Sequence, residues 1–394
     1  MDLRLADRMA QLGTETAFEV LARARELERK GKSIVHLEIG EPDFETPEHI
    51  KDAAIKALRE GFTHYTPAAG MSEAREAVAE HVETTRKVRV DPGEVVITPG
   101  SKPIMFFGIL ALVNPGDEVI VPNPGYPIYE SVTKFAGGVA KPLVLREERG
   151  FRIDPAELRA AASPRTRLIV LNSPHNPCGS ALTREDLAVI ADVAQRHNAF
   201  VLADEIYGQI MYDGPHHSIL SLPGMKERTI LLDGFSKAYA MTGWRLGYGV
   251  MPRDLAARVA QLMVNSNSCA AAFTQIAGIA ALRGPRGAVQ AMVAEFRRRR
   301  DVIVNGLNAI DGLSCTMPSG AFYAFPNAKR LDGNSKRLAD YLLNDAGVAC
   351  LSGTAFGDAG QGYLRFSYAN SVENITEALR RIREALKRYQ APVG

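Results

Sequence analysis

The sequence predicts an α/β protein with a large domain at residues 46–285 and a smaller α+β domain formed by residues 1–45 together with 286–394. The first observation is that short apolar strands alternate with helical segments from about residue 94. Continuously apolar strands separated by helices are typical of a mostly parallel sheet covered on both faces. The second observation is that this alternation stops near residue 285. The third is the length of 394 residues, which favours two domains over one small core.

The first 90 residues contain helices and one short strand that precede the alternating region. Apolar residues at helical spacing predict a helix over residues 14–30, and an apolar run predicts a strand at 33–37. Thr46 as the cap and Pro47 at the first helical position predict a helix that reaches about residue 60. Another helix is expected to begin at Ser72. We expect the first helix and strand to pack on the smaller domain, because the main sheet begins only later.

Six strands of the main sheet are predicted, at residues 95–97, 118–121, 168–171, 200–203, 230–232 and 246–250. A helix at 103–113 separates the first two, and Thr183 begins a capping box for a helix that extends to Gln195. Several strands end in polar residues, at 98–102, 172–177, 204–207 and 233–248. Because ligands bind at the carboxyl ends of the strands in such sheets, these polar segments predict one shared site.

The C-terminal part combines a long helix, two strand-like segments and a final amphipathic helix. The long helix is expected at residues 288–308, and the strand-like segments are 321–325 and 363–367. In the final helix, apolar residues between Val372 and Leu386 recur at intervals of three and four. This arrangement predicts the smaller α+β domain.

Composition and charge limit the possible functions. The 46% hydrophobic and 23% charged residues are ordinary for a soluble globular protein. The net charge of +2, from 47 basic and 45 acidic residues, argues against a nucleic-acid partner. The longest apolar run, residues 104–113, is too short to span a membrane, and the mixed charges of residues 1–8 argue against a signal peptide.

The cysteines indicate the redox environment. The four of them are widely separated and have no C-x-x-C spacing: Cys178, Cys269, Cys315 and Cys350. This spacing predicts reduced thiols, with neither a disulfide framework nor a metal site. We therefore expect a cytoplasmic protein.

The stretch from Asp233 to Tyr248 follows a buried strand and carries the residue on which the functional prediction depends. Lys237 lies among small and hydroxyl residues, with Gly234 and Ser236 just before it. A half-buried lysine loses its proton readily and can attack a carbonyl. An ordinary lysine in an exposed turn explains this stretch equally well on its own, so the other strand ends must decide.

The other strand ends supply groups that match one cofactor. The turn at 100–102 precedes a helix whose N-terminus can hold a phosphate, with Ser236 and Arg245 as further ligands. Asp204 ends an apolar strand, where a carboxylate is costly unless it faces a cation, and Tyr126 offers a ring face. An aldehyde, a phosphate, a ring cation and an aromatic face together describe pyridoxal phosphate.

Eight motifs in order carry a resemblance to a known family. They are Gly40–Phe44, Tyr65–Gly70, Asn123–Tyr126, Asn176–Gly179, Asp204–Tyr207, Ser236–Lys237, Gly243–Arg245 and Leu364–Phe366. With these motifs the chain resembles a class I/II aminotransferase of the aspartate aminotransferase fold type, from about residue 15 to residue 388. The resemblance implies a sheet of the seven-stranded type and pyridoxal phosphate as the cofactor.

The resemblance also implies a role for each matching residue around the cofactor ring. Lys237 would be the Schiff-base lysine and proton shuttle, and Asp204 would pair with the pyridine nitrogen. Asn176 and Tyr207 would bind the phenolic oxygen, and Tyr126 would stack on the ring. Lys237, Asp204 and Tyr207 are thus the expected catalytic residues.

The implied phosphate and substrate ligands complete the expected site. The phosphate ligands would be Ser101 and Lys102, through backbone N–H groups, together with Ser236 and Arg245. Tyr65 would reach the phosphate of the neighbouring subunit, which implies a homodimer with shared active sites. Arg365 would bind the substrate α-carboxylate through its two-pronged guanidinium, beside Gly40, with Tyr126 and Asn176 as further substrate contacts.

Four departures from the family pattern bear on the site. Gly234 stands where the family often has a serine or threonine, so we expect the phosphate to depend more on backbone N–H groups, Ser236 and Arg245. Cys178 replaces a threonine and is interpreted as a packing residue, as is the neighbouring His175. Residues 13–17 differ from the Ser-Ala-Thr pattern of the bacterial aspartate-specific branch, and no second arginine can be placed for a distal carboxylate.

The predicted function is an aminotransferase that moves an amino group between a 2-amino acid and a 2-oxo acid through a pyridoxal phosphate/pyridoxamine phosphate shuttle. The donor is aspartate or a broad or aromatic set, with 2-oxoglutarate as the expected acceptor. A carbon–sulfur β-lyase on the same fold is the first alternative. A cofactor-sensing regulatory domain is disfavoured, because a match that begins near residue 15 leaves no room for a DNA-binding module.

Overall fold

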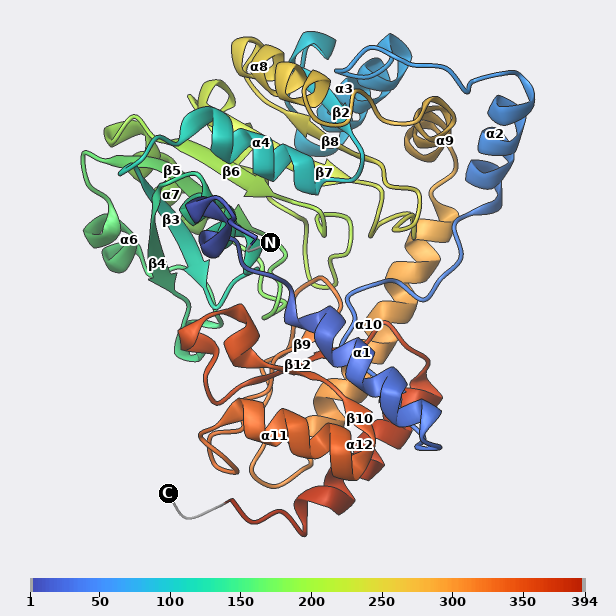
Figure 1. Ribbon diagram of the computed structural model, residues 1–394, viewed down its shortest axis with the longest axis vertical. Coiled ribbons are helices and arrows are strands. Elements are labelled where there is room, and N and C mark those ends of the chain that lie inside the picture. The colour runs from blue at the N-terminus through green and yellow to red at the C-terminus, as the bar shows by residue number, and fades with distance from the viewer. Residues whose placement is uncertain (1–2, 392–394) are drawn as a thin grey trace.

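The computed structural model describes residues 3–391, and its main feature is a seven-stranded sheet (Figure 1). The strands follow the order β2-β8-β7-β6-β5-β3-β4. Their bounds are β2 (Val95–Thr98), β3 (Glu118–Asn123), β4 (Val139–Val144), β5 (Thr166–Asn172), β6 (Phe200–Asp204), β7 (Thr229–Gly234) and β8 (Gly247–Val250). Strand β8 runs antiparallel to both of its neighbours, and the other pairs are parallel. The predicted α/β fold with a mostly parallel sheet is therefore confirmed.

The sheet is covered by helices on both faces, because its strands alternate their apolar side chains between two cores. On β5, Leu168 and Val170 face the core that contains α4, α5 and α8. Ile169 and Leu171 on the same strand face the core that contains α6 and α7. The bounds are α4 (Lys102–Leu112), α5 (Ile128–Phe135), α6 (Pro155–Ala161), α7 (Arg184–Arg196) and α8 (Arg253–Val264). Burial on both faces explains why the central strands are continuously apolar.

The structure differs from the sequence-based expectation at two places in this region. Strand β4 is not among the six predicted, because an edge strand with Lys141, Pro142 and a largely exposed Val139 lacks a continuous apolar run. The predicted helix cap at Thr46 is wrong. The Thr46 hydroxyl donates to the carbonyl of Ala240 at 2.7 Å, and the helix begins after Pro47 without a side-chain cap. The predicted capping box at Thr183 is confirmed.

Three helices pack at the β2–β8 end of the sheet. They are α2 (Glu48–Arg59), α3 (Ser72–Arg86) and α9 (Ala272–Arg283). Their buried residues form one core with Val95 and Ile97 of β2 and with Tyr248 and Val250 of β8.

The two ends of the chain build a second core around two small sheets. Strand β1 (Val35–His36) pairs in parallel with β10 (Val348–Ala349). Strand β12 (Leu364–Ser367) lies between β11 (Leu351–Ser352) and β9 (Tyr323–Ala324). The expected strands at 33–37 and 321–325 are thus real but only two residues long. The division of the chain into two domains at the predicted boundaries stays a prediction.

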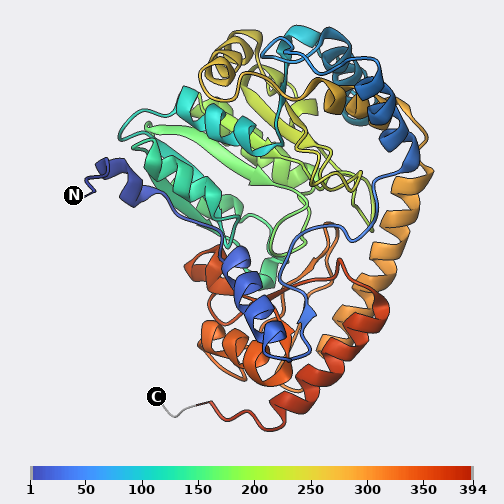
Figure 2. The ribbon, with the colours of Figure 1, turned by 45° about the vertical axis from the view of Figure 1, so that its right-hand side comes forward.

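Four helices surround these small sheets. They are α1 (Thr16–Arg29), α10 (Gly287–Asn308), α11 (Ser335–Tyr341) and α12 (Val372–Leu386). Figure 2 shows α10 running along one edge of the molecule from the helices of the large sheet to the C-terminal part, where α12 packs on it. Figures 1 and 2 both place α1 against the C-terminal part. Within residues 3–391, no helix is both long and apolar enough to cross a membrane.

Candidate active site

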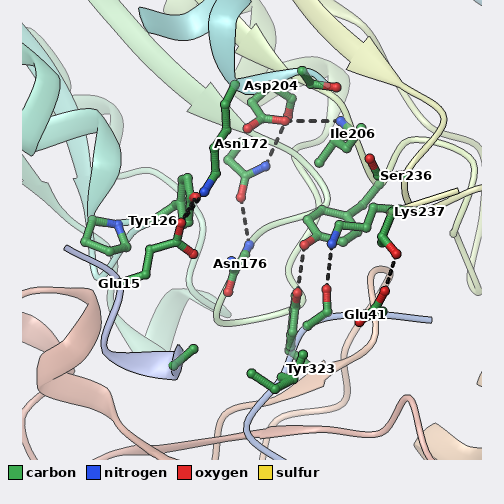
Figure 3. Close-up of a pocket in the computed structure, with 18 of the residues that line it drawn as sticks. Glu15, Glu41, Tyr126, Asn172, Asn176, Asp204, Ile206, Ser236, Lys237 and Tyr323 are labelled. Carbon is green, nitrogen blue, oxygen red and sulfur yellow. Dashed lines mark hydrogen bonds and ion pairs between the residues drawn. The ribbon is translucent and has the colours of Figure 1, made fainter. Parts of the chain in front are cut away.

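A cavity of about 490 Å³ lies where the carboxyl ends of β5, β6 and β7 face the small sheet of β11, β12 and β9 (Figure 3). It is lined by all but one of the residues predicted for the site: Gly40, Ser101, Lys102, Tyr126, Asn176, Asp204, Tyr207, Ser236, Lys237, Arg245 and Arg365. The exception is Tyr65, which is 91% exposed and does not line the cavity of its own chain. The strand ends therefore converge as the sequence predicted.

Asp204 lies at the end of β6 and forms one wall of the cavity. Tyr129 donates its hydroxyl to Asp204 Oδ2 at 2.6 Å, and the backbone N–H of Ile206 donates to Oδ1 at 3.2 Å. Burial raises the pKa of Asp204 to about 6, against the hydrogen bond from Tyr129, which lowers it. A buried carboxylate with a raised pKa is stabilised as an anion when a cation faces it. Asp204 is thus arranged to hold a positively charged group.

Lys237 projects from the segment after β7 into the same cavity. Its Nζ donates to the carbonyl of Gly40 at 2.5 Å and lies about 6.0 Å from the ring centre of Tyr207. Burial lowers the pKa of Lys237 to about 8, and the positive charge of Arg365 acts in the same direction. An amine with this pKa is partly neutral near neutral pH and can act as a nucleophile or base.

Arg365 on β12 lies at the side of the cavity that the sheet of β11, β12 and β9 forms. It is 4% exposed, and its guanidinium lies between the rings of Tyr323 and Phe356, with 4.5 and 4.9 Å to their centres. One Nη donates to Asn176 Oδ1 at 3.2 Å and the other to the carbonyl of Glu38. Arg365 Nε is buried and has no hydrogen-bond partner among the described residues. This guanidinium is held rigidly and retains a donor for an anionic ligand.

The opposite end of the cavity can hold an anion. Helix α4 begins at Lys102 without a side-chain cap, so its first N–H groups face this end. Gly100 has a φ of +79°, and a Cβ at this position would overlap the guanidinium of Arg245. Ser236 is buried beside this turn. The arrangement is a cradle of N–H groups, a hydroxyl and a guanidinium of the kind that binds phosphate.

The missing hydroxyl at Gly234 has a structural explanation. A Cβ at Gly234 would overlap Ser101 Oγ and approach the Cα of Gly247 to 2.9 Å. Ser101 Oγ occupies this space and donates to the carbonyl of Asp233 at 2.8 Å. A different hydroxyl thus lies where the side chain of residue 234 would be.

Sequence reasoning did not single out several cavity residues as functional: Glu15, Glu41, Tyr129, Asn172 and Tyr323. Asn172 donates to the carbonyl of Asp204 at 3.1 Å and accepts the N–H of Asn176 at 2.7 Å. Tyr323 shares a hydrogen bond of 2.7 Å with the hydroxyl of Tyr207. Asn172 belongs to the polar segment 172–177 that predicts the shared site, but no role of its own is assigned to it from the sequence. Tyr129 lies in the mixed polar and apolar helix α5 and Tyr323 in an apolar segment, so neither carried such a signal.

His175 and Cys178 lie outside the cavity, as their interpretation as packing residues requires. His175 is buried, and burial lowers its pKa to about 3. Cys178 belongs to the core between the sheet and α7. All four cysteines are free thiols, and no cluster of metal-ligating side chains occurs within residues 3–391.

The fold and this site together define the class of the protein: it is an enzyme of the pyridoxal-phosphate-dependent fold type I. A family model for aminotransferase class I and II matches residues 32–382. The chain belongs to this family, whose members use pyridoxal phosphate for transamination.

Individual relatives and solved structures agree with this assignment. The chain is 39% identical to an aspartate aminotransferase of Rhizobium meliloti, covering 97% of this chain and 96% of the relative. It is also 39% identical to aromatic-amino-acid aminotransferase 2 of Thermococcus litoralis, covering 98% and 99%. The aspartate aminotransferase of Thermus thermophilus with maleate superimposes with a TM-score of 0.94 at 39% identity, covering 98% of this chain and 100% of that one.

The residues of this cavity fit the cofactor. The cradle at Gly100 and Arg245 has no room for a side chain and exposes donors for a phosphate. Asp204 offers a buried carboxylate to a ring cation, and Lys237 offers an amine to an aldehyde. These three features match three different parts of pyridoxal phosphate.

Proposed function

We propose that this aminotransferase moves an amino group between a 2-amino acid and a 2-oxo acid, with Lys237 as the catalytic amine. The observation that carries the proposal is the position of Lys237, which enters the cavity with a pKa lowered to about 8 by burial. Asp204 and Arg365 line the same cavity. The transaminase class is that of the family, whereas the roles of individual residues are our proposal.

Five residues would hold the phosphate and the ring. Ser101 and Lys102 would bind the phosphate through their backbone N–H groups, together with Ser236 and Arg245. Tyr126 would lie against the ring, since its half-buried side chain faces the cavity. When bound, pyridoxal phosphate supplies an aldehyde that accepts the amino group and a protonated ring that withdraws electrons from the substrate Cα.

Asp204, Asn176 and Tyr207 would set the charge state of the bound ring. The Asp204 carboxylate would keep the ring nitrogen protonated, and the opposed cation would lower the pKa of this carboxyl from about 6. Asn176 and the Tyr207 hydroxyl would donate to the phenolic oxygen. Tyr129 orients Asp204 by donating to its carboxylate, and Asn172 does so by donating to its backbone carbonyl.

Arg365 and Lys237 would act on the substrate. The Arg365 guanidinium would bind the α-carboxylate, with Asn176 and the aromatic rings of Tyr323 and Phe356 fixing its orientation. The Lys237 amine would then remove the proton from the substrate Cα as a general base and deliver it to the cofactor carbon as a general acid. Gly40 would lie next to the carboxylate, because it lies two residues after Glu38, whose carbonyl accepts from the Arg365 guanidinium, and it lines the same cavity.

The experiment is a half-reaction panel on the protein loaded with pyridoxal phosphate. Aspartate, phenylalanine, leucine, alanine and glutamate are added singly, and absorbance follows conversion to pyridoxamine phosphate. Lys237→Ala is expected to abolish this conversion, because no amine remains to move the Cα proton. Full transamination by this variant would refute the role of Lys237.

The same protein separates transamination from the β-lyase alternative. Incubation with cystathionine and no oxo acid should yield neither pyruvate nor ammonia. Sustained release of both, without conversion to pyridoxamine phosphate by any amino acid of the panel, would favour the lyase.

We further propose a homodimer in the cytoplasm. Tyr65 supports the dimer, because its exposed hydroxyl lies outside its own cavity and is free to reach the phosphate of a neighbouring subunit. The four free thiols support a reducing compartment. Sedimentation equilibrium tests the dimer, and a monomer at micromolar concentration with full activity would contradict it.

A further inference from the structure

The charged side chains of the cavity leave one cation without a task in the proposed function. The basic lining residues in the described chain are Lys102, Lys237, Arg245 and Arg365, and the acidic ones are Glu15, Glu41 and Asp204. Lys237 serves as the amine, Arg245 faces the phosphate and Arg365 faces the α-carboxylate. The Lys102 ammonium is therefore the remaining positive charge that a second carboxylate of the substrate could contact.

Glu15 already forms an ion pair with the Lys102 ammonium. Glu15 Oε1 accepts from Lys102 Nζ and from the Tyr126 hydroxyl, the latter at 2.8 Å. Figure 3 shows Glu15 beside Tyr126 on one side of the cavity, whereas Lys237 and Glu41 lie on the other side. The Glu41 carboxylate accepts from the Thr242 hydroxyl there. Glu15 is thus the acidic side chain that neutralises Lys102.

The backbone holds Glu15 in this place. Glu15 is the residue before α1, but its side chain makes no cap hydrogen bond to that helix. The preceding segment is fixed by the N–H of Gly13, which donates to Ser131 Oγ at 2.7 Å. The Glu15 side chain is 21% exposed, and the Lys102 side chain is 55% exposed. The pair lies at the edge of the cavity, where an incoming substrate side chain would contact it.

We propose that Glu15 is a specificity-determining residue that directs the cavity toward substrates with a neutral, apolar or aromatic side chain and against dicarboxylic substrates. This inference rests on the proposed aminotransferase function. A second substrate carboxylate would approach the Glu15 carboxylate, and like charges repel unless the Glu15–Lys102 pair first separates. A neutral side chain meets no such cost and gains contact with Ala17, Phe18 and Ile39, which line the same cavity.

The same reasoning applies to the acceptor. In a shuttle, the amino acid and the oxo acid use one cavity in turn, so a second carboxylate on the oxo acid meets Glu15 as well. A monocarboxylic oxo acid such as phenylpyruvate is therefore preferred over 2-oxoglutarate. This differs from 2-oxoglutarate, the acceptor expected from the sequence.

The test compares the wild-type protein with Glu15→Gln. Glutamine has nearly the same shape and can still accept from Tyr126, but it carries no charge and releases Lys102. The ratio of kcat/KM for aspartate to that for phenylalanine, measured in the half-reaction, should rise on the order of tenfold. Calorimetry on the loaded protein supplies a readout without turnover. The affinity for succinate should rise by a similar factor, while that for 3-phenylpropionate stays constant.

Two further variants assign the effect to the charge pair. Glu19→Gln removes an exposed glutamate from the first turn of α1, outside the cavity. This variant should leave the aspartate-to-phenylalanine ratio of kcat/KM and the affinity for succinate unchanged. In the double variant Glu15→Gln with Lys102→Met, the gain for aspartate and succinate should disappear, because no cation remains. Lys102→Met keeps the backbone N–H of residue 102, so the phosphate contact is preserved.

The outcomes separate the inference from the function on which it rests. If wild-type protein prefers aspartate over phenylalanine and Glu15→Gln leaves the ratio unchanged, the inference is wrong while transamination stands. If no amino acid converts the cofactor, the proposed function fails. The relative affinities for succinate and 3-phenylpropionate still decide the role of Glu15 in that case.

Discussion

At the scale of single residues, the protonation of Lys237 depends on a carboxylate that it does not touch. Burial lowers the pKa of Lys237, whereas the negative charge of Glu41 opposes this shift. Glu41 lines the cavity on the same side as Lys237 and accepts from Thr242 (Figure 3). Glu41 therefore limits how much of the amine is neutral at a given pH.

This balance predicts a pH dependence. Only the neutral amine attacks an aldehyde, so the rate at which apoprotein attaches pyridoxal phosphate should rise with pH around a midpoint of about 8. Removing the charge in Glu41→Gln removes an influence that raises the pKa of Lys237, so the midpoint should move to lower pH. Stopped-flow absorbance between about pH 6 and 10 measures both curves. A midpoint that stays unchanged in Glu41→Gln, or moves upward, would contradict this account.

A second residue-scale feature is the buried ion cluster behind the site. Arg86 is 6% exposed and donates to Glu205 at 3.1 Å and to Asp233 at 2.5 Å. Tyr248 also donates to Asp233, at 3.1 Å. Glu205 directly follows β6 and Asp233 lies near the end of β7, and their charges add to burial in raising the pKa of Asp204. Arg86 thus pairs with Asp233, and it shares Glu205 with His216, whose Nε2 lies 2.9 Å from Glu205 Oε2.

Removing this cation should be costly. Arg86→Met leaves the buried Asp233 without its ion-pair partner and Glu205 with His216 alone, and we expect the free energy of unfolding to fall by about 3–5 kcal/mol. The matched control is Arg253→Met, because the Arg253–Asp91 pair is largely exposed, at 66% and 56%. Its loss should cost less than about 1 kcal/mol. Urea denaturation of both variants provides the comparison, and equal losses would show that burial does not decide the effect.

At the scale of elements, the N-terminus of α4 and the turn before it determine the anion end of the cavity. The turn needs Gly100 for two reasons, its φ of +79° and its close approach to Arg245. The glycine before a predicted helix could be identified in the sequence, but its contact with Arg245, which lies far away in the chain, could not. Tertiary structure alone brings these two residues together.

Gly100→Ala separates the two reasons when compared with Gly116→Ala. Gly116 has a φ of +87°, but no atom lies within 4 Å of the place that an alanine methyl would take, so its variant carries the backbone strain alone. In Gly100→Ala the methyl displaces the Arg245 guanidinium, and the Kd for pyridoxal phosphate should rise about tenfold. Equilibrium dialysis measures both variants. A similar Kd for the two would indicate that strain, and not the contact, is responsible.

At the scale of the whole molecule, the sequence predicts what depends on local pattern. The central strands are continuously apolar, and the polar residues at their ends are recognisable, so the sheet and the position of Lys237 follow from the order of residues. Glu15 and Lys102 are 87 residues apart, and Tyr129 and Asp204 are 75 apart. Neither pair has a sequence signature, because the contact forms only when distant parts of the chain fold together at the large sheet.

Exposed apolar side chains near the N-terminus form a second feature at this scale. Large apolar side chains near the N-terminus are unusually accessible, with Leu3, Leu5 and Met9 at 83%, 61% and 45% exposure. Single exposed apolar residues are ordinary, but several within one short segment indicate an interaction surface. Tyr65, at 91%, belongs to the same class of exposed aromatic or apolar side chains. In the proposed homodimer, these residues are available to contact the neighbouring subunit.

The dimer should therefore weaken when this segment becomes polar. In Leu5→Ser with Met9→Ser, each subunit loses two apolar side chains, each worth about 1.5–3 kcal/mol if it is fully buried in the interface. Even partial burial predicts that the dissociation constant of the dimer rises at least about tenfold. Sedimentation equilibrium at several concentrations measures this constant. Met317→Ser, at an exposed apolar residue distant in the chain, should leave it unchanged. Equal dissociation constants for wild type and the double variant would show that the N-terminal segment does not contribute to the dimer.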